Sequence, residues 1–127
     1  MNLINKFNTF RADKSRADCS FFPHNNQTYN IYNEADKNKL VKQFGKHFYL
    51  LSLTNNIYNK SAIRKARNLG VLAFGKWKNF IDISVLINNK SKADIIKLAK
   101  EYKQISVIEF LNDKAQEIQI NKLSNGL

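Results

Sequence analysis

The chain has 127 residues, 43% of them apolar and 12% aromatic, so it is long and apolar enough for one domain with a buried core. Its formal net charge is +11 at pH 7, which favours a polyanionic partner. A single cysteine, Cys19, excludes an intramolecular disulfide framework. The longest apolar run is far below the ~20 residues of a membrane span, and the N-terminus lacks the apolar segment of a secretory signal. We therefore expect no membrane partner and a cytoplasmic protein, in the host cytoplasm or the virion if a phage encodes it.

The positive charge is concentrated in the middle third of the chain. Residues 37–81 hold ten basic residues and no acidic one, whereas residues 1–36 hold four of each kind and residues 82–127 hold seven basic and six acidic. The ten are Lys37, Lys39, Lys42, Lys46, Lys60, Arg64, Lys65, Arg67, Lys76 and Lys78. A field of this sign attracts nucleic acid, an acidic protein face or anionic lipid.

Local patterns predict the elements before residue 60. Residues 1–30 are expected to form an N-terminal arm or extension, with a turn at 21–26 and a short strand at 28–32. Asn33 is expected to cap a helix that ends near Gly45. Residues 47–54 are almost entirely apolar and predict a central strand covered on both faces.

The second half of the chain shows clearer periodicity. A helix capped by Ser61 is expected over 61–69 and one capped by Ser91 over 92–103, with strands at 71–75, 80–87 and 104–111. A turn at 112–114 then predicts a final hairpin. The expected core comprises Leu50, Leu51, Leu53, Ile81, Ile83, Val85, Ile96, Ala99, Val107 and Ile108.

The order of these elements from 47 to 111 is β-α-β-β-α-β. This order predicts an α+β fold of the split βαββαβ, ferredoxin-like class, with two helices on one face of an antiparallel sheet. The C-terminal hairpin would extend that sheet. We expect a single α+β domain over residues 31–121, an extension before it and a frayed tail at 122–127.

Several short motifs resemble a family of small uncharacterised proteins from bacteria and their phages. They are Ser52-Leu53-Thr54-Asn55, Arg67-Asn68, Gly75-Lys76-Trp77, Ile83-Ser84 and the stretch from Leu98 to Val107. The chain departs from the family pattern at Ile83, where the family has an acid; here Asp82 stands one place earlier. The resemblance implies a compact α/β unit of microbial or phage origin and carries no established activity.

Signs of catalysis or of a cofactor site are weak. His24, His47 and Cys19 do not have metal-ligand spacing, and no glycine-rich phosphate loop is present, so we expect no metal and no cofactor. Asp82 and Ser84 share a strand face, where a carboxylate can act as an acid or base or simply be satisfied by a backbone donor. Polar residues at element ends, Thr54, Asn55, Asn68 and Gln104, fit either a binding cleft or local capping.

The strongest candidate site is a nucleic-acid-binding surface within the basic window. It comprises Lys60, Arg64, Lys65 and Arg67 on one helix and Lys76, Trp77 and Lys78 on the following loop. Cations beside an exposed indole would combine phosphate contact with base stacking. The alternative is a solvated basic face with Trp77 packed inward.

The sequence thus favours a small, basic, non-enzymatic module that binds a polyanion, with nucleic acid held by its backbone as the first interpretation. An alternative is a phage-type interaction protein, either a virion component or an inhibitor that docks on an acidic face of a host protein. A third is a small enzyme or nucleotide-binding protein that uses the polar strand ends. The oligomeric state, the choice between DNA and RNA and the role of residues 1–30 stay open.

Overall fold

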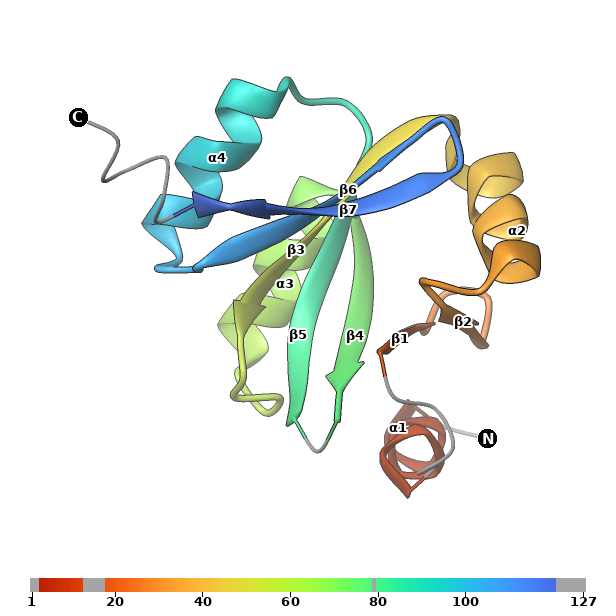
Figure 1. Ribbon diagram of the computed structural model, residues 1–127. Coiled ribbons are helices and arrows are strands. Elements are labelled where there is room, and N and C mark those ends of the chain that lie inside the picture. Colours follow the sequence, from red (N-terminus) through yellow and green to blue (C-terminus); the bar gives the residue numbers. More distant parts are fainter. Residues whose placement is uncertain (1–2, 13–17, 79, 121–127) are drawn as a thin grey trace.

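The computed structural model describes residues 3–12, 18–78 and 80–120 (Figure 1). Its helices are α1 (Leu3–Ala12), α2 (Glu34–Phe44), α3 (Lys60–Leu69) and α4 (Lys92–Glu101). Its strands are β1 (Cys19–Phe22), β2 (Gln27–Asn30), β3 (His47–Thr54), β4 (Val71–Trp77), β5 (Phe80–Ile87), β6 (Ser106–Leu111) and β7 (Lys114–Gln119). The strands form one sheet in the order β2-β1-β4-β5-β3-β6-β7, and every neighbouring pair is antiparallel.

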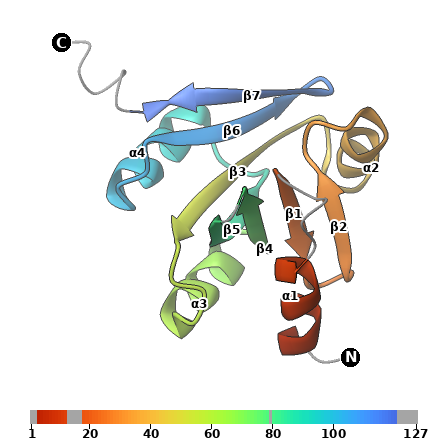
Figure 2. The ribbon, with the colours of Figure 1, turned by 60° about the horizontal axis from the view of Figure 1, so that its bottom comes forward.

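The predicted ferredoxin-like fold class is wrong. The expected strands and helices between 47 and 111 occur in the expected order along the chain, but the sheet that they join has seven strands and curls into a half-barrel (Figure 2). Residues 19–30 supply two of the additional strands, because β1 pairs with β4 through Cys19–Lys76, Ser20–Gly75 and Phe21–Phe74. Two helices on one face of a small sheet therefore do not describe this protein.

Local capping explains where the helices begin. The Asn33 side chain accepts a hydrogen bond from the backbone N–H of Asp36, and that of Ser91 accepts one from Asp94, as the sequence predicts. Helix α3 differs, because its N-cap is Asn59 and not Ser61; the Asn59 side chain accepts from the N–H of Ala62. The cap at Asn59 adds Lys60 to the first turn of the helix.

The sheet has an outer and an inner face, each with its own core cluster. Helices α1, α3 and α4 pack on the outer face, where their buried side chains include Phe10, Ala62, Ala66, Ile95 and Ala99. Helix α2 packs on the inner face, inside the curl, through Leu40 (Figure 2). Of the expected core residues, Leu50, Leu51, Leu53, Ile83, Val85, Ala99 and Val107 are buried, and Ile81, Ile96 and Ile108 are half-buried.

The inner face is packed unevenly. Helix α2 packs against β2 and β3, and its neighbours on the sheet include Phe22, Phe48 and Phe110. Further along β4 and β5, toward the hairpin that joins them, the inner-face residues become small or polar and then aromatic. They are Ala73, Gly75 and Trp77 on β4 and Ser84, Asp82 and Phe80 on β5.

Candidate nucleic-acid interface

Helix α3 carries four of the predicted binding cations, and all four are exposed: Lys60, Arg64, Lys65 and Arg67. The buried residues Ala62 and Ala66 fix the face that α3 turns to the sheet. With 100° between successive residues, Lys60, Arg64 and Arg67 lie on the opposite side of the helix, and Lys65 lies on its flank. None of the four forms an ion pair with a carboxylate among the described residues.

The lysines of α2 do not join this stripe. Lys39 and Lys42 are exposed on α2, which packs on the other face of the sheet. Lys37 is buried, and its Nζ lies 2.6 Å from Oε1 of Glu34. The fold therefore divides the positive window between two sides of the molecule.

Lys76 is a predicted binding residue with a different position. Lys76 is only 6% exposed. Its Nζ lies 3.5 Å from the carbonyl oxygen of Phe10 and 3.4 Å from that of Arg11. These carbonyls belong to the C-terminal turn of α1, where a cation is favourable. Lys76 thus fastens α1 to β4, and its ammonium group is not presented on the surface.

The hairpin between β4 and β5 presents two large aromatic side chains. Trp77 and Phe80 are opposite each other in the β4–β5 register and are 53% and 69% exposed. Lys78, with a left-handed φ of 53°, places its Nζ 5.6 Å from the centroid of the Trp77 ring. The alternative in which Trp77 packs inward is therefore wrong, and the indole is available to a partner.

A third exposed aromatic lies at the same end of the sheet. Tyr58, 77% exposed, stands in the loop between β3 and α3, and β3 ends at Thr54 opposite Ile83. Figure 1 shows this loop and the β4–β5 hairpin at the bottom of the sheet, with α3 behind β3 and β5. Lys60, at the start of α3, belongs to this end, whereas Arg67 lies about 10 Å further along the helix axis.

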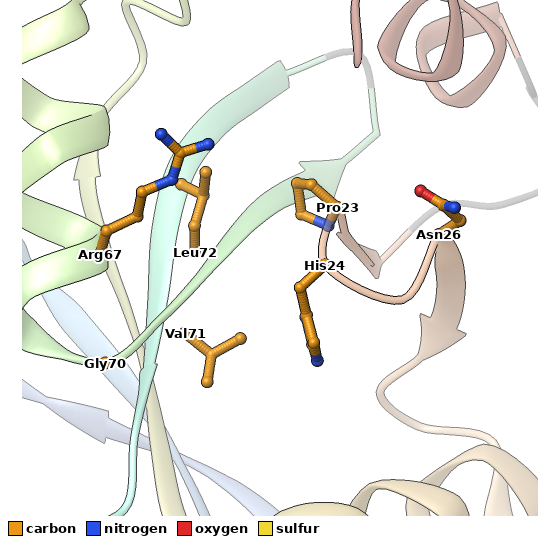
Figure 3. Close-up of a pocket in the computed structure, with 7 residues that line it drawn as sticks. All are labelled: Pro23, His24, Asn26, Arg67, Gly70, Val71 and Leu72. Carbon is orange, nitrogen blue, oxygen red and sulfur yellow. The ribbon is translucent and has the colours of Figure 1, made fainter. Parts of the chain in front are cut away.

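Arg67 borders a pocket of about 510 Å³ (Figure 3). The pocket lies between the start of β4 and the turn that joins β1 to β2, and it is lined by Pro23, His24, Asn26, Arg67, Gly70, Val71 and Leu72. Arg67 is also in the last turn of α3, where a positive charge interacts favourably with the helix dipole. The apolar lining and the nearby helix C-terminus make this pocket a poorer phosphate site than the exposed stripe.

His24 belongs to a side-chain network between the β1–β2 turn and α2. The Oε1 atom of Gln43 accepts a hydrogen bond from the Asn25 amide, so the Gln43 amide nitrogen faces Nε2 of His24 at 3.2 Å. An amide nitrogen only donates, so Nε2 of His24 is the acceptor in this contact when the imidazole is neutral. This network fastens the β1–β2 turn to α2.

Asp82 and Ser84, which share a strand face in the sequence, are in contact. The Ser84 hydroxyl donates to Oδ1 of Asp82 at 2.6 Å, and the carboxylate also accepts from the Ser52 side chain and the Gly75 N–H. Burial raises the pKa of Asp82, although these three hydrogen bonds act in the opposite direction. The group lies on the inner face directly behind the aromatic pair.

A second polar cluster surrounds Glu109, which is 3% exposed and which the sequence interpretation missed. Its carboxylate accepts from the Tyr49 hydroxyl at 3.0 Å and from the Gln116 amide at 2.7 Å, and it lies 2.7 Å from Nε2 of His47. Glu109 alternates with Val107 on the core-facing side of β6, and an acid at such a position signals buried partners.

The remaining polar candidates have local roles or exposed positions. The Thr54 hydroxyl oxygen accepts from the N–H of Asn56, and the Gln104 amide donates to the carbonyl of Tyr102. Asn55 and Asn68 are exposed. Within the described ranges, no three His, Cys, Asp or Glu side chains are grouped as metal ligands, and no helix is long and apolar enough to cross a membrane.

Comparison with known proteins finds no matching family model, no matching curated protein and no matching solved structure.

Proposed function

We propose that this protein binds single-stranded nucleic acid, with phosphates held by the outer stripe of α3 and by Lys78, and with bases stacked on Trp77 and Phe80. The observation that supports it is the pair of exposed aromatic rings on a hairpin that also carries Lys78, at the end of the sheet where α3 begins. The rings lie on the inner face and α3 on the outer face, so a strand that contacts both would pass around this end of the sheet. Aromatic platforms flanked by cations bind single strands with little sequence preference, because every base has a π-face.

The exposed aromatics favour a single strand over a duplex. In a duplex the bases are stacked on one another, so Trp77 and Phe80 would have no face to contact. The cations of α3 supply attraction to phosphate in either case. The rings therefore distinguish the two substrates, and affinity for a single strand should exceed that for a duplex of the same length.

The test is a titration of labelled single-stranded and duplex DNA and RNA at several salt concentrations. Replacing Arg64 and Arg67 with Gln should weaken binding and reduce the log–log salt slope by roughly 0.7 for each lost contact to a single strand. The matched control replaces Lys97 and Lys100, exposed on α4, with Gln and removes the same charge elsewhere. Equal losses in both variants would indicate an unspecific electrostatic attraction.

An acidic protein surface is the competing partner for the same cations. If neither DNA nor RNA binds at low salt, in single-stranded or duplex form, the proposed function is wrong. A protein partner then becomes the explanation for the exposed aromatic pair.

A further inference from the structure

We propose that the inner face, at the end where the β4–β5 hairpin lies, binds one unstacked base, and that Asp82 makes guanine the preferred base there. This inference rests on the proposed function, because it names the base that the same surface prefers. The aromatic pair supplies the stacking face, and the carboxylate supplies a hydrogen-bond acceptor beside it.

The register of β4 and β5 places these parts next to each other. Trp77 is opposite Phe80, and the next pair on the same face is Gly75 opposite Asp82. Pairs on one face of a sheet follow each other at about 7 Å. A base that stacks on the aromatic pair and extends along the strands by this distance would bring one edge to the Asp82 carboxylate.

Gly75 determines where that carboxylate lies. A Cβ atom on residue 75 would be 2.6 Å from Oδ1 of Asp82 and 3.2 Å from the Ser84 hydroxyl oxygen. Real Cβ atoms do not approach this closely, so any side chain at position 75 would displace the carboxylate. The absence of a side chain at Gly75 lets the Asp82 carboxylate lie across the strand, where Ser84 holds it.

The carboxylate keeps capacity for a ligand. An ionised carboxylate offers about four acceptor positions, and Asp82 receives hydrogen bonds from Ser84, Ser52 and Gly75. Asp82 as a whole residue is half-buried, and burial is the largest influence on its carboxyl group. Retaining a carboxylate among apolar strands opposes folding, since burial disfavours its charged form. Such a group is more readily explained by a binding role than by stability.

The chemistry of an acceptor-only group favours guanine. The Watson–Crick edge of guanine presents two adjacent donors, the ring N–H and the exocyclic amino group. Cytosine and adenine place a ring-nitrogen acceptor beside their amino group, and thymine and uracil flank one N–H with two carbonyl oxygens. Guanine alone therefore offers a carboxylate two adjacent donors, whereas each of the other bases places an acceptor lone pair beside its donor.

The direct test compares single-stranded DNA pentamers that differ only at the centre, TTGTT, TTATT, TTCTT and TTTTT. Trp77 is the only tryptophan in the chain, so quenching of its fluorescence reports stacking at this site. We expect TTGTT to bind roughly 10-fold more tightly than TTTTT, which is the range of one hydrogen bond to a charged group. Equal affinity for all four pentamers would overturn the guanine site and leave the proposed function standing.

Two variants assign the preference to Asp82. Asp82→Asn should reduce the guanine preference to less than about twofold, because an amide offers both a donor and an acceptor. The control Asp113→Asn removes the same charge from the exposed β6–β7 turn and should keep the preference. Gly75→Ala keeps the charge but displaces the carboxylate, and it too should lose the preference. A guanine preference that survives in Asp82→Asn would overturn the assignment.

Failure of the proposed function has a different signature. If no pentamer quenches Trp77 at low salt and the longer strands also fail to bind, both the interface and the guanine site are wrong. The wild-type series alone makes this distinction, whether or not a variant folds.

Discussion

Nε2 of His47 lies 2.7 Å from Oε2 of the buried Glu109 carboxylate, 62 residues away in the sequence. The same carboxylate accepts from Tyr49 and Gln116, and Lys92 of α4 lies 4.0 Å from it. One buried acid thereby connects β3, β6, β7 and α4. This connection stabilises the half-barrel on the side away from the proposed interface.

Replacing Glu109 with Gln should destabilise the fold by about 1–3 kcal/mol. The amide brings a donor to a site that already contains donors from Tyr49 and Gln116, so at least one of these loses its acceptor. Urea unfolding measures the effect. The control Glu117→Gln removes the same charge from an exposed position on β7 and should change stability by no more than about 0.5 kcal/mol.

The same residue predicts an acid dependence. Burial alone would raise the pKa of Glu109, but hydrogen bonds from Gln116, His47 and Tyr49 and the charge of Lys92 outweigh it and hold this pKa below the ordinary 4.5. The folded state therefore binds fewer protons than the unfolded state, and the stabilisation is lost as the pH falls below about 4.5. The Gln variant should lose less stability over this range than the wild type does. Parallel acid curves would contradict the assignment.

Tyr49→Phe should show the complementary effect at alkaline pH. The pKa of Tyr49 is raised from 10.0 to about 12. Burial is the largest cause, and the hydrogen bond to Glu109 and the negative charge of Glu109 add to it. The folded state keeps the proton that the unfolded state releases, so the stability that Tyr49 contributes falls between pH 10 and about 12. The melting temperature should fall less steeply across this pH range for the Phe variant than for the wild type. An unchanged slope would count against a buried, neutral Tyr49.

Ile83→Ala tests the outer core. Ile83 is fully buried on β5, where its neighbours in the core cluster include Phe74 and Val85. Truncation should cost about 2–5 kcal/mol, because it removes buried methylene groups and leaves a cavity. Chemical denaturation measures this loss in the free energy of unfolding. A loss below about 1 kcal/mol would mean that the core collapses around the gap or that Ile83 is not tightly packed.

The sequence predicted elements better than their assembly. Residues 80–87 alternate clearly, and Ser91 has the side chain that an N-cap requires, so β5 and α4 were recognisable. Strand β1 was not, because all four of its residues are buried and Phe21-Phe22-Pro23 resembles the start of a turn. The pairing of β1 with β4, which overturned the fold class, is a long-range contact that no local pattern encodes.

The candidate site was predictable to a similar degree. The charge pattern located the cations of α3, which the structure leaves exposed. It could not show that Lys76 turns toward α1, since this depends on a helix more than sixty residues earlier in the chain. The contact between Gly75 and Asp82 likewise depends on strand register, which the sequence alone does not fix.

The most direct test of the proposed function is the affinity of Trp77→Ala for a labelled single strand, measured together with its free energy of unfolding. Because Trp77 is 53% exposed, its truncation should change stability by no more than about 0.5 kcal/mol. The lost stacking should weaken binding by about 1–3 kcal/mol. Tyr32→Ala, which removes an exposed aromatic outside the β4–β5 hairpin, should leave the affinity unchanged. Unchanged affinity in the Trp77 variant, or no binding by the wild type at low salt, would contradict the account.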